Sequence, residues 1–242
     1  MTHIFEWDRS YFPSVVALSI IIVCYFCYWF ISQSARLSAI CQRKFGGENA
    51  QANYILSQRL IGIFFLGVAP VIAALIIFPE GLRAYGVAVP KVLPTIYWTG
   101  GISLGLLPLV LSFSRKPDFY RTYPLIRKKN WDMKLIAINT SSWFIYLLAY
   151  EFFFRGLLLF VCWRAFGSYP AILINVSLYF CVHIPYGFWV SLGSIPLGFA
   201  MCLATLHTGG IWVAFAVHLL VALLNDYIAL RANPEIVVTR LK

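Results

Sequence analysis

The chain has 242 residues, of which 61% are hydrophobic and only 12% are charged. Soluble domains carry about 25% charged residues, so this composition, with a mean hydropathy of +0.79, excludes an ordinary soluble protein. The net charge of +10 comes from Lys and Arg residues that cluster between apolar runs, as in the cytoplasmic loops of membrane proteins. We therefore predict a lipid bilayer as the environment of the chain and no nucleic-acid partner.

Seven apolar runs are candidates for membrane-spanning helices. In chain order they cover residues 12–33, 59–79, 93–113, 135–163, 169–184, 188–206 and 209–230. The fourth run is too long for one ordinary span, so it is either a single tilted helix or two pieces that meet near Glu151. The sequence therefore predicts an all-α fold, a polytopic transmembrane helical bundle of seven or eight helices, with residues 1–242 forming a single membrane domain.

Basic residues are distributed unevenly between the apolar runs. The segments 34–58 and 114–134 are rich in Lys and Arg, whereas the segment 80–92 carries only two basic residues. The positive-inside rule places the first two segments in the cytoplasm and the N-terminus outside. Seven spans then return the basic C-terminus to the cytoplasm, so the charge pattern favours seven spans over eight.

The N-terminal residues 1–9 contain two acidic residues and one arginine, which is a poor start for a secretory signal peptide. We therefore interpret the first apolar run as an uncleaved membrane helix and the polar segment 40–56 as a surface loop. These features predict an integral, multi-pass membrane protein, located in the plasma membrane of a bacterium or the endoplasmic reticulum of a eukaryote.

Six cysteines are present, and five of them lie in apolar runs. Buried cysteine acts mainly as a small hydrophobic residue, so we predict no disulfide framework. Cys24 and Cys27 have the spacing of a redox or metal motif, but their position inside the first run favours a packing role.

Glu151 is the most informative residue, because it lies deep in apolar sequence. A carboxylate in the bilayer core costs about 2.5–3.5 kcal/mol on insertion scales, so such residues are functional candidates by default. Arg155 follows four residues later and would share a helical face with Glu151. An ion pair between them makes both charges tolerable in the membrane, but it does not explain why either charge is present.

Two histidines also lie in apolar runs. His183 is close to the end of the fifth run, where an interfacial histidine at a helix C-terminus is the alternative interpretation. His218 lies near the middle of the last run, and Asn225 follows about 20° around the helix and roughly 10 Å along it. A hydrogen bond between helices is the alternative role for both of these residues. Asp226 is assigned to the end of the same helix.

One glutamate and two histidines on three helices are suited to hydrolysis. Glutamate acts as a general base on water, and histidine holds that water or protonates a leaving amine. The same three side chains are also a possible ligand set for Zn²⁺. Serine chemistry is disfavoured, because no serine in an apolar run stands out near a histidine. A transporter or a haem carrier with two histidine ligands is a further alternative, although no internal repeat supports a transporter.

The three segments, in this order, resemble the CAAX-processing and bacteriocin-processing family of glutamic-type intramembrane proteases, also called the ABI family, which includes the type II CAAX prenyl endopeptidases. Glu151 to Gly156 is similar to the second half of the family's Glu-Glu-x-x-x-Arg motif. Tyr179 and His183 match its second motif, an aromatic residue followed by histidine four positions later. His218 matches the first position of its third motif, His-x-x-x-Asn.

The resemblance covers residues 135–230, which we interpret as a CAAX-protease-like core. It implies an intramembrane endopeptidase that acts on a membrane-anchored or lipidated protein or peptide, and it favours a mechanism without metal or cofactor over one with zinc. Glu151 would activate water, His183 would orient it, and His218 would stabilise the oxyanion. Three supporting residues complete the expected site: Arg155, Asn225 and Tyr179.

Two positions depart from the motifs of the family. Tyr150 stands where the first glutamate of the pair is expected, and Ala222 stands where the asparagine of the third motif is expected. Loss of one oxyanion donor typically lowers a rate by about 10²–10³. The sequence therefore leaves a second function open, a catalytically inactive membrane scaffold or immunity-type protein that retains the fold.

Overall fold

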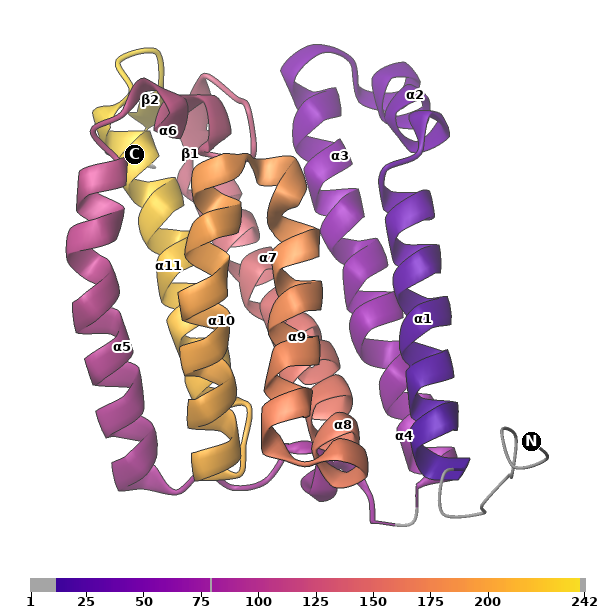
Figure 1. The fold of residues 1–242 in the computed structure, drawn as a ribbon. Helices are drawn as coiled ribbons and strands as arrows, with labels where there is room; N and C mark the ends of the chain where they lie inside the picture. The colour runs from indigo at the N-terminus through magenta and orange to yellow at the C-terminus, as the bar shows by residue number, and fades with distance from the viewer. Residues whose placement is uncertain (1–11, 79, 240–242) are drawn as a thin grey trace.

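A computed structural model describes residues 12–78 and 80–239 of the chain (Figure 1). Among these residues, seven helices are long and apolar enough to cross a membrane. They are Phe12–Ser32, Gly47–Ile77, Val92–Phe113, Met133–Phe166, Ser168–Tyr186, Phe188–Thr208 and Trp212–Ala232. Helices satisfy every backbone polar group within one segment, which is why apolar chains take this form in lipid. The predicted all-α bundle is confirmed, with seven candidate spans rather than eight.

The first two spans form one antiparallel pair. Helix α1 (Phe12–Ser32) is followed by the short helix α2 (Ala35–Phe45), and the second span then runs without a break through α3 (Gly47–Gly62), the π-helix η2 (Ile63–Val68) and α4 (Ala69–Ile77). After the 3-10 turn η3 (Leu82–Tyr85), α5 (Val92–Phe113) forms the third span.

The prediction of a surface loop over residues 40–56 is wrong, because this segment is helical. The Ser34 side chain accepts a hydrogen bond from the backbone N–H of Leu37 and so begins α2. Gly46, with φ 63°, ends α2 and allows α3 to start immediately. The polarity of this segment reflects its place at the end of the bundle rather than an absence of helix.

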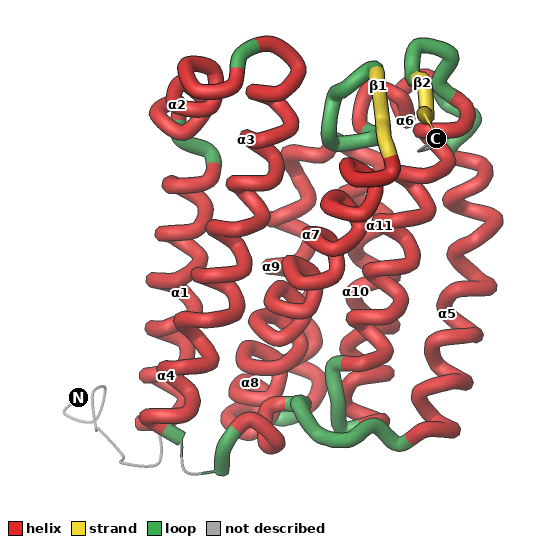
Figure 2. Tube along the Cα trace, turned by 180° about the vertical axis from the view of Figure 1, so that it is seen from behind, coloured by secondary structure: helices red, strands yellow, loops and turns green. Residues whose placement is uncertain are grey.

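The fourth span is one continuous helix of 34 residues, with a wide turn in its middle. Helix α7 (Met133–Glu151) passes into the π-helix η4 (Phe152–Leu158) and then into α8 (Leu159–Phe166). Every side chain of η4 is buried, whereas α5 contains no buried side chain. In Figure 2, α7 runs through the middle of the view, between α3 and α11, and α5 lies at the edge of the bundle.

The remaining spans complete the bundle. Helix α9 (Ser168–His183) and the 3-10 turn η5 (Ile184–Tyr186) lead into α10 (Phe188–Thr208), which is followed by α11 (Trp212–Ala232). A short strand β2 (Val237–Thr239) after α11 pairs in parallel with β1 (Asn130–Asp132), with Asn130 opposite Val237.

The two basic segments lie at the same end of the bundle. Figure 1 shows α2, the short helix α6 (Pro117–Thr122) and both strands at this end, opposite the start of α1. Gln51 joins the two segments, because its side chain donates to the Leu125 carbonyl at 2.9 Å and accepts from the Arg127 N–H at 2.6 Å. This arrangement agrees with the loop pairing that the charge pattern predicts.

Candidate active site

Glu151 is the last residue of α7, and its side chain is 0% exposed. Nη1 of Arg155, in the following wide turn, lies 3.2 Å from Oε2 and 3.5 Å from Oε1 of Glu151. Both side chains are fully buried, so each charge is compensated mainly by the other. The predicted pairing of these two residues on one helical face is therefore present in the structure.

His218 reaches the same carboxylate from α11. Its Nδ1 lies 2.5 Å from Oε1 of Glu151. An ionised carboxylate only accepts hydrogen bonds, so this contact places a proton on Nδ1 and leaves Nε2 free for water or substrate. The His218 side chain is 16% exposed, in contrast to the enclosed carboxylate behind it.

His183 ends α9 and completes the group of three predicted residues. Its Nδ1 lies 2.7 Å from the backbone carbonyl of Tyr179, one turn earlier in the same helix. A carbonyl is an acceptor, so this contact also assigns the proton to Nδ1 of His183. The unprotonated Nε2 is then available to accept a hydrogen bond. The Tyr179 ring centroid is 4.3 Å from the ring of His183 and 6.2 Å from that of His218. Tyr179 therefore lies next to both imidazoles.

Tyr179 also packs against the ion pair. The Arg155 guanidinium lies over its ring, 4.0 Å from the centroid, in a cation–π contact. Helix α10 approaches closely here because Gly198 has no side chain, and a Cβ at that position would be 2.9 Å from the Tyr179 ring. Arg155, Tyr179 and Gly198 thus form one packed group beside the two histidines.

The wide turn η4 is held by a residue that the sequence analysis did not identify. Asn175 of α9 is buried, and its Nδ2 donates to the Phe154 carbonyl inside the turn at 2.6 Å. The Cys202 thiol of α10 donates to Asn175 Oδ1 at 3.2 Å. A lone amide in an apolar helix was the available signal, because buried amides in membranes normally bind a neighbouring helix.

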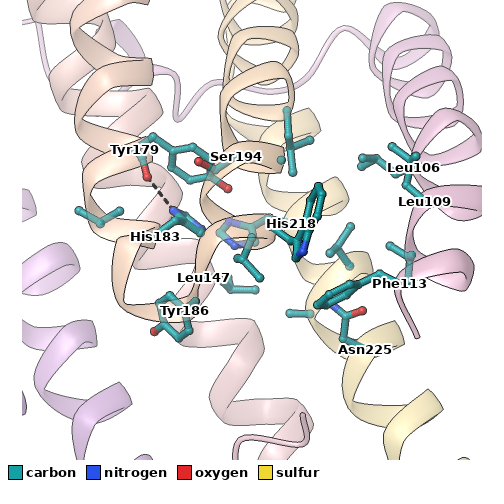
Figure 3. A pocket seen from close by; sticks show the side chains of 18 of the residues that line it. Leu106, Leu109, Phe113, Leu147, Tyr179, His183, Tyr186, Ser194, His218 and Asn225 are labelled. Carbon is teal, nitrogen blue, oxygen red and sulfur yellow. Dashed lines mark hydrogen bonds between the residues drawn. The ribbon is translucent and has the colours of Figure 1, made fainter. Parts of the chain in front are cut away.

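A cavity of about 730 Å³ lies beside these residues (Figure 3). Side chains of α1, α5, α7, α9, α10 and α11 line it, and most of them are apolar. His183 and His218 belong to the lining, whereas Glu151 does not. The carboxylate therefore lies behind the cavity wall, and the His218 imidazole that it binds faces the cavity.

The two positions that depart from the family motifs, and Asn225, also face this cavity. Tyr150, Ala222 and Asn225 are part of its lining. The Tyr150 ring is 5.5 Å from that of His218, and its hydroxyl has no hydrogen-bond partner within the described part of the chain. Among the same residues, Asn225 makes no hydrogen bond with the glutamate or either histidine, so the structure does not bring it into the central group.

Asp226 is not at the end of its helix, as the sequence analysis expected, and it is only 1% exposed. Helix α11 continues for six more residues to Ala232, which places Asp226 inside the bundle. Its Oδ2 accepts hydrogen bonds from Asn139 Nδ2 at 3.0 Å and from Trp143 Nε1 at 2.7 Å. This second buried polar group, near the basic end of the bundle, was missed at the sequence level.

No cluster of three or more His, Cys, Asp or Glu side chains that could hold a metal ion occurs within residues 12–78 and 80–239. At the candidate site, the charges of Glu151 and Arg155 compensate one another. Fold and site together define an integral, multi-pass, all-α membrane protein with a carboxylate–imidazole pair beside a cavity within the bundle.

Residues 130–224 match the protein family described as type II CAAX prenyl endopeptidase Rce1-like. This match confirms the family resemblance predicted from the sequence motifs, and it supports a CAAX-protease-type intramembrane peptidase in general. The matched segment includes Glu151, His183 and His218 and ends one residue before Asn225. No curated protein and no solved structure matches the chain.

Proposed function

We propose that the protein is an intramembrane endopeptidase that hydrolyses a peptide bond near a membrane-anchored or lipidated C-terminus. The observation that carries this proposal is the hydrogen bond between His218 and the fully buried Glu151. The His218 imidazole faces a cavity large enough for a peptide segment. The pair lies in a segment that matches a family of CAAX-protease-type peptidases.

The geometry favours His218 as the group that touches the attacking water. With Nδ1–H donated to Glu151, the free Nε2 can take a proton from water, while the water oxygen bonds to the scissile carbonyl carbon. Glu151 then stabilises the resulting imidazolium, and Arg155 keeps Glu151 ionised. Breakage of the C–N bond returns the proton from Nε2 to the leaving amine. Glutamate and histidine thus activate water as one unit.

His183 and Asn225 would contact the reactants from other walls of the cavity. The free Nε2 of His183 can hold the water in line with the carbonyl, with the ring fixed by the Tyr179 carbonyl. Asn225 lies seven residues from His218, roughly 10 Å along α11, so we assign it a contact with the substrate away from the reacting carbonyl. Tyr179 and Arg155 would support the histidines and the carboxylate, respectively.

Replacement of Glu151 by glutamine is the first test of this function. A glutamine amide at this position would donate to Nδ1 of His218 and impose the wrong tautomer, a change that lowers related acid–base catalysis by about 10⁴. We expect the new C-termini produced by the active protein, identified by comparative proteomics of membrane proteins, to disappear in Glu151→Gln. The exposed Glu235→Gln is the matched control and should cleave normally.

A reaction carried out by an imidazole and a carboxylate does not require a metal. We therefore expect the cleavage rate of the purified protein to stay within about twofold of its starting value after dialysis against a strong chelator. A loss of activity that added zinc restores would instead favour the ligand set in which Glu151 and the two histidines bind Zn²⁺.

A second candidate function is an inactive membrane scaffold or immunity-type protein. It is favoured by Tyr150 and Ala222, which replace two polar residues of the family motifs. Single alanine variants of Glu151, His183 and His218, assayed for the biological phenotype, separate the two functions. Full phenotypic activity in all three variants would support the scaffold and contradict the peptidase.

A further inference from the structure

Helices α7 and α11 run antiparallel, and two of the polar contacts between them lie eight residues apart on each helix. One is Glu151 to His218, and the other is Trp143 to Asp226. Trp143 precedes Glu151 by eight residues, and Asp226 follows His218 by eight residues. Both contacts therefore belong to the same antiparallel register, separated by about 12 Å along each helix.

The second contact is fixed by a chain of hydrogen bonds that starts on α3. Arg59 is buried, and its Nη1 donates to Asn139 Oδ1 at 2.8 Å and to Ser142 Oγ at 2.7 Å. Asn139 links Arg59 to Asp226, because its Nδ2 donates to Oδ2 of Asp226. The Arg59 guanidinium also lies over the Trp143 ring, 3.9 Å from the centroid. Arg59 of α3 and Asp226 of α11 thus bind neighbouring side chains of α7.

Between the two polar contacts, α7 and α11 pack through apolar side chains, which do not define one register. Leu147 and Ala222 lie midway, four residues from each contact, within one buried apolar cluster. Apolar side chains at a helix interface can pack in neighbouring registers, and a slip by one turn is about 5.4 Å. A slip of that size would break the 2.5 Å contact between His218 and Glu151.

We propose that Asp226 is a positioning residue, which sets the register of α11 against α7 and so holds His218 on Glu151. Buried polar and ionic groups are often no more stabilising than apolar residues of similar size, and their best-attested use is to specify one packing arrangement. The catalytic part of this inference rests on the proposed peptidase function, whereas the register itself does not.

Two matched double variants separate register from charge. Arg59→Met/Asp226→Asn is neutral and keeps an oxygen that accepts from Trp143 and Asn139. Arg59→Met/Asp226→Leu is equally neutral and has no acceptor. The hydrogen bond between the hydroxyls of Thr140 and Tyr227, also between α7 and α11, is unchanged in both.

Register is measured in these two backgrounds without reference to activity. Leu147→Cys and Ala222→Cys are introduced after replacement of the six native cysteines, and a short thiol-specific cross-linker is added. We expect efficient cross-linking in the Asp226→Asn background and a several-fold lower yield in the Asp226→Leu background. Equal yields would overturn the inference, even if the protein proves not to be a peptidase.

Kinetics then connect the register to the reaction. A misplacement of about 1 Å can cost 10²-fold, so we expect the Asp226→Leu background to lower kcat by about 10-fold to 100-fold with little change in KM. The Asp226→Asn background should stay near the activity of Arg59→Met alone. A kcat that is equal in the two backgrounds would show that Asp226 does not position the site. Absence of cleavage by the unaltered protein would count against the proposed function and leave the cross-linking result to decide the register.

Discussion

The carboxylate of Glu151 is compensated from two sides, by Arg155 on its own helix and by His218 from α11. The spacing of four residues was enough to predict the first partner. The second partner depends on how two helices distant in the chain are placed, and no short-range pattern reports this. The same contact changes the expected chemistry, because the carboxylate acts on the cavity through His218 rather than directly.

Tyr150 stands in place of the first glutamate of the family motif, so its replacement tests whether Glu151 alone supports catalysis. Its hydroxyl has no hydrogen-bond partner in the described structure, so the proposed mechanism assigns it no proton transfer. We expect Tyr150→Phe to cleave at a rate within about threefold of the unaltered protein, as for a buried change that breaks no hydrogen bond. A loss of more than about tenfold in steady-state assays would give the hydroxyl a chemical role.

The burial of Arg59 and of Asp226 was not predicted from the sequence. Arg59 is the first residue of the second apolar run, where no role was predicted for it, and Asp226 was assigned to the end of the last helix. Helix α3 begins at Gly47, well before the second apolar run, and α11 continues past Asp226 to Ala232, so both residues lie within the bundle; sequence patterns define helix ends poorly.

At the scale of single elements, the wide turn η4 is the feature that hydropathy could not reveal. π-helical turns often occur at functional sites, and this one begins directly after Glu151. The sequence allowed either one tilted helix or two pieces meeting near Glu151, and the structure has one helix with a local widening at that point.

Helix α5 offers a test of the cavity as the substrate site. Gly101 lines the cavity, and a Cβ built there finds no atom within 4 Å. Gly101→Leu should therefore fold, with the usual gain of up to about 1 kcal/mol for removing a helical glycine, while its side chain fills cavity space. We expect KM for the cleaved substrate to rise by about tenfold, the effect of a clash worth roughly 1.4 kcal/mol.

Gly100 provides the control for that experiment. A Cβ at Gly100 also meets open space, but this residue is not part of the cavity lining. Gly100→Leu should leave KM unchanged. If both leucine variants behave like the unaltered protein in the same assay, the cavity wall formed by α5 does not contact the substrate.

For the whole molecule, hydropathy predicted much of the architecture. The seven apolar runs correspond to the seven candidate spans, because about 20 apolar residues are needed to cross a bilayer. The polar start of the second span was missed, since residues at the end of the bundle need no apolar surface. The grouping of the basic segments at one end follows from charge and is visible in Figure 1.

The charge asymmetry also predicts the orientation of the bundle. Arg43 lies at the basic end, near the end of α2, and Lys91 directly precedes α5 at the opposite end; both are exposed. In a background without the native cysteines, a membrane-impermeant thiol reagent should label Lys91→Cys in intact cells and Arg43→Cys only after permeabilisation. Labelling of Arg43→Cys alone in intact cells would reverse the orientation.

The central claim is that Glu151, acting through His218, activates water for peptide-bond hydrolysis. Its most direct test is cleavage of a peptide substrate by the purified protein in liposomes, in water enriched in ¹⁸O. We predict incorporation of ¹⁸O into the new C-terminal carboxyl group, and a rate lower by about 10³–10⁴ in Glu151→Gln but unchanged in Glu235→Gln. Cleavage by Glu151→Gln at the unaltered rate would contradict the account.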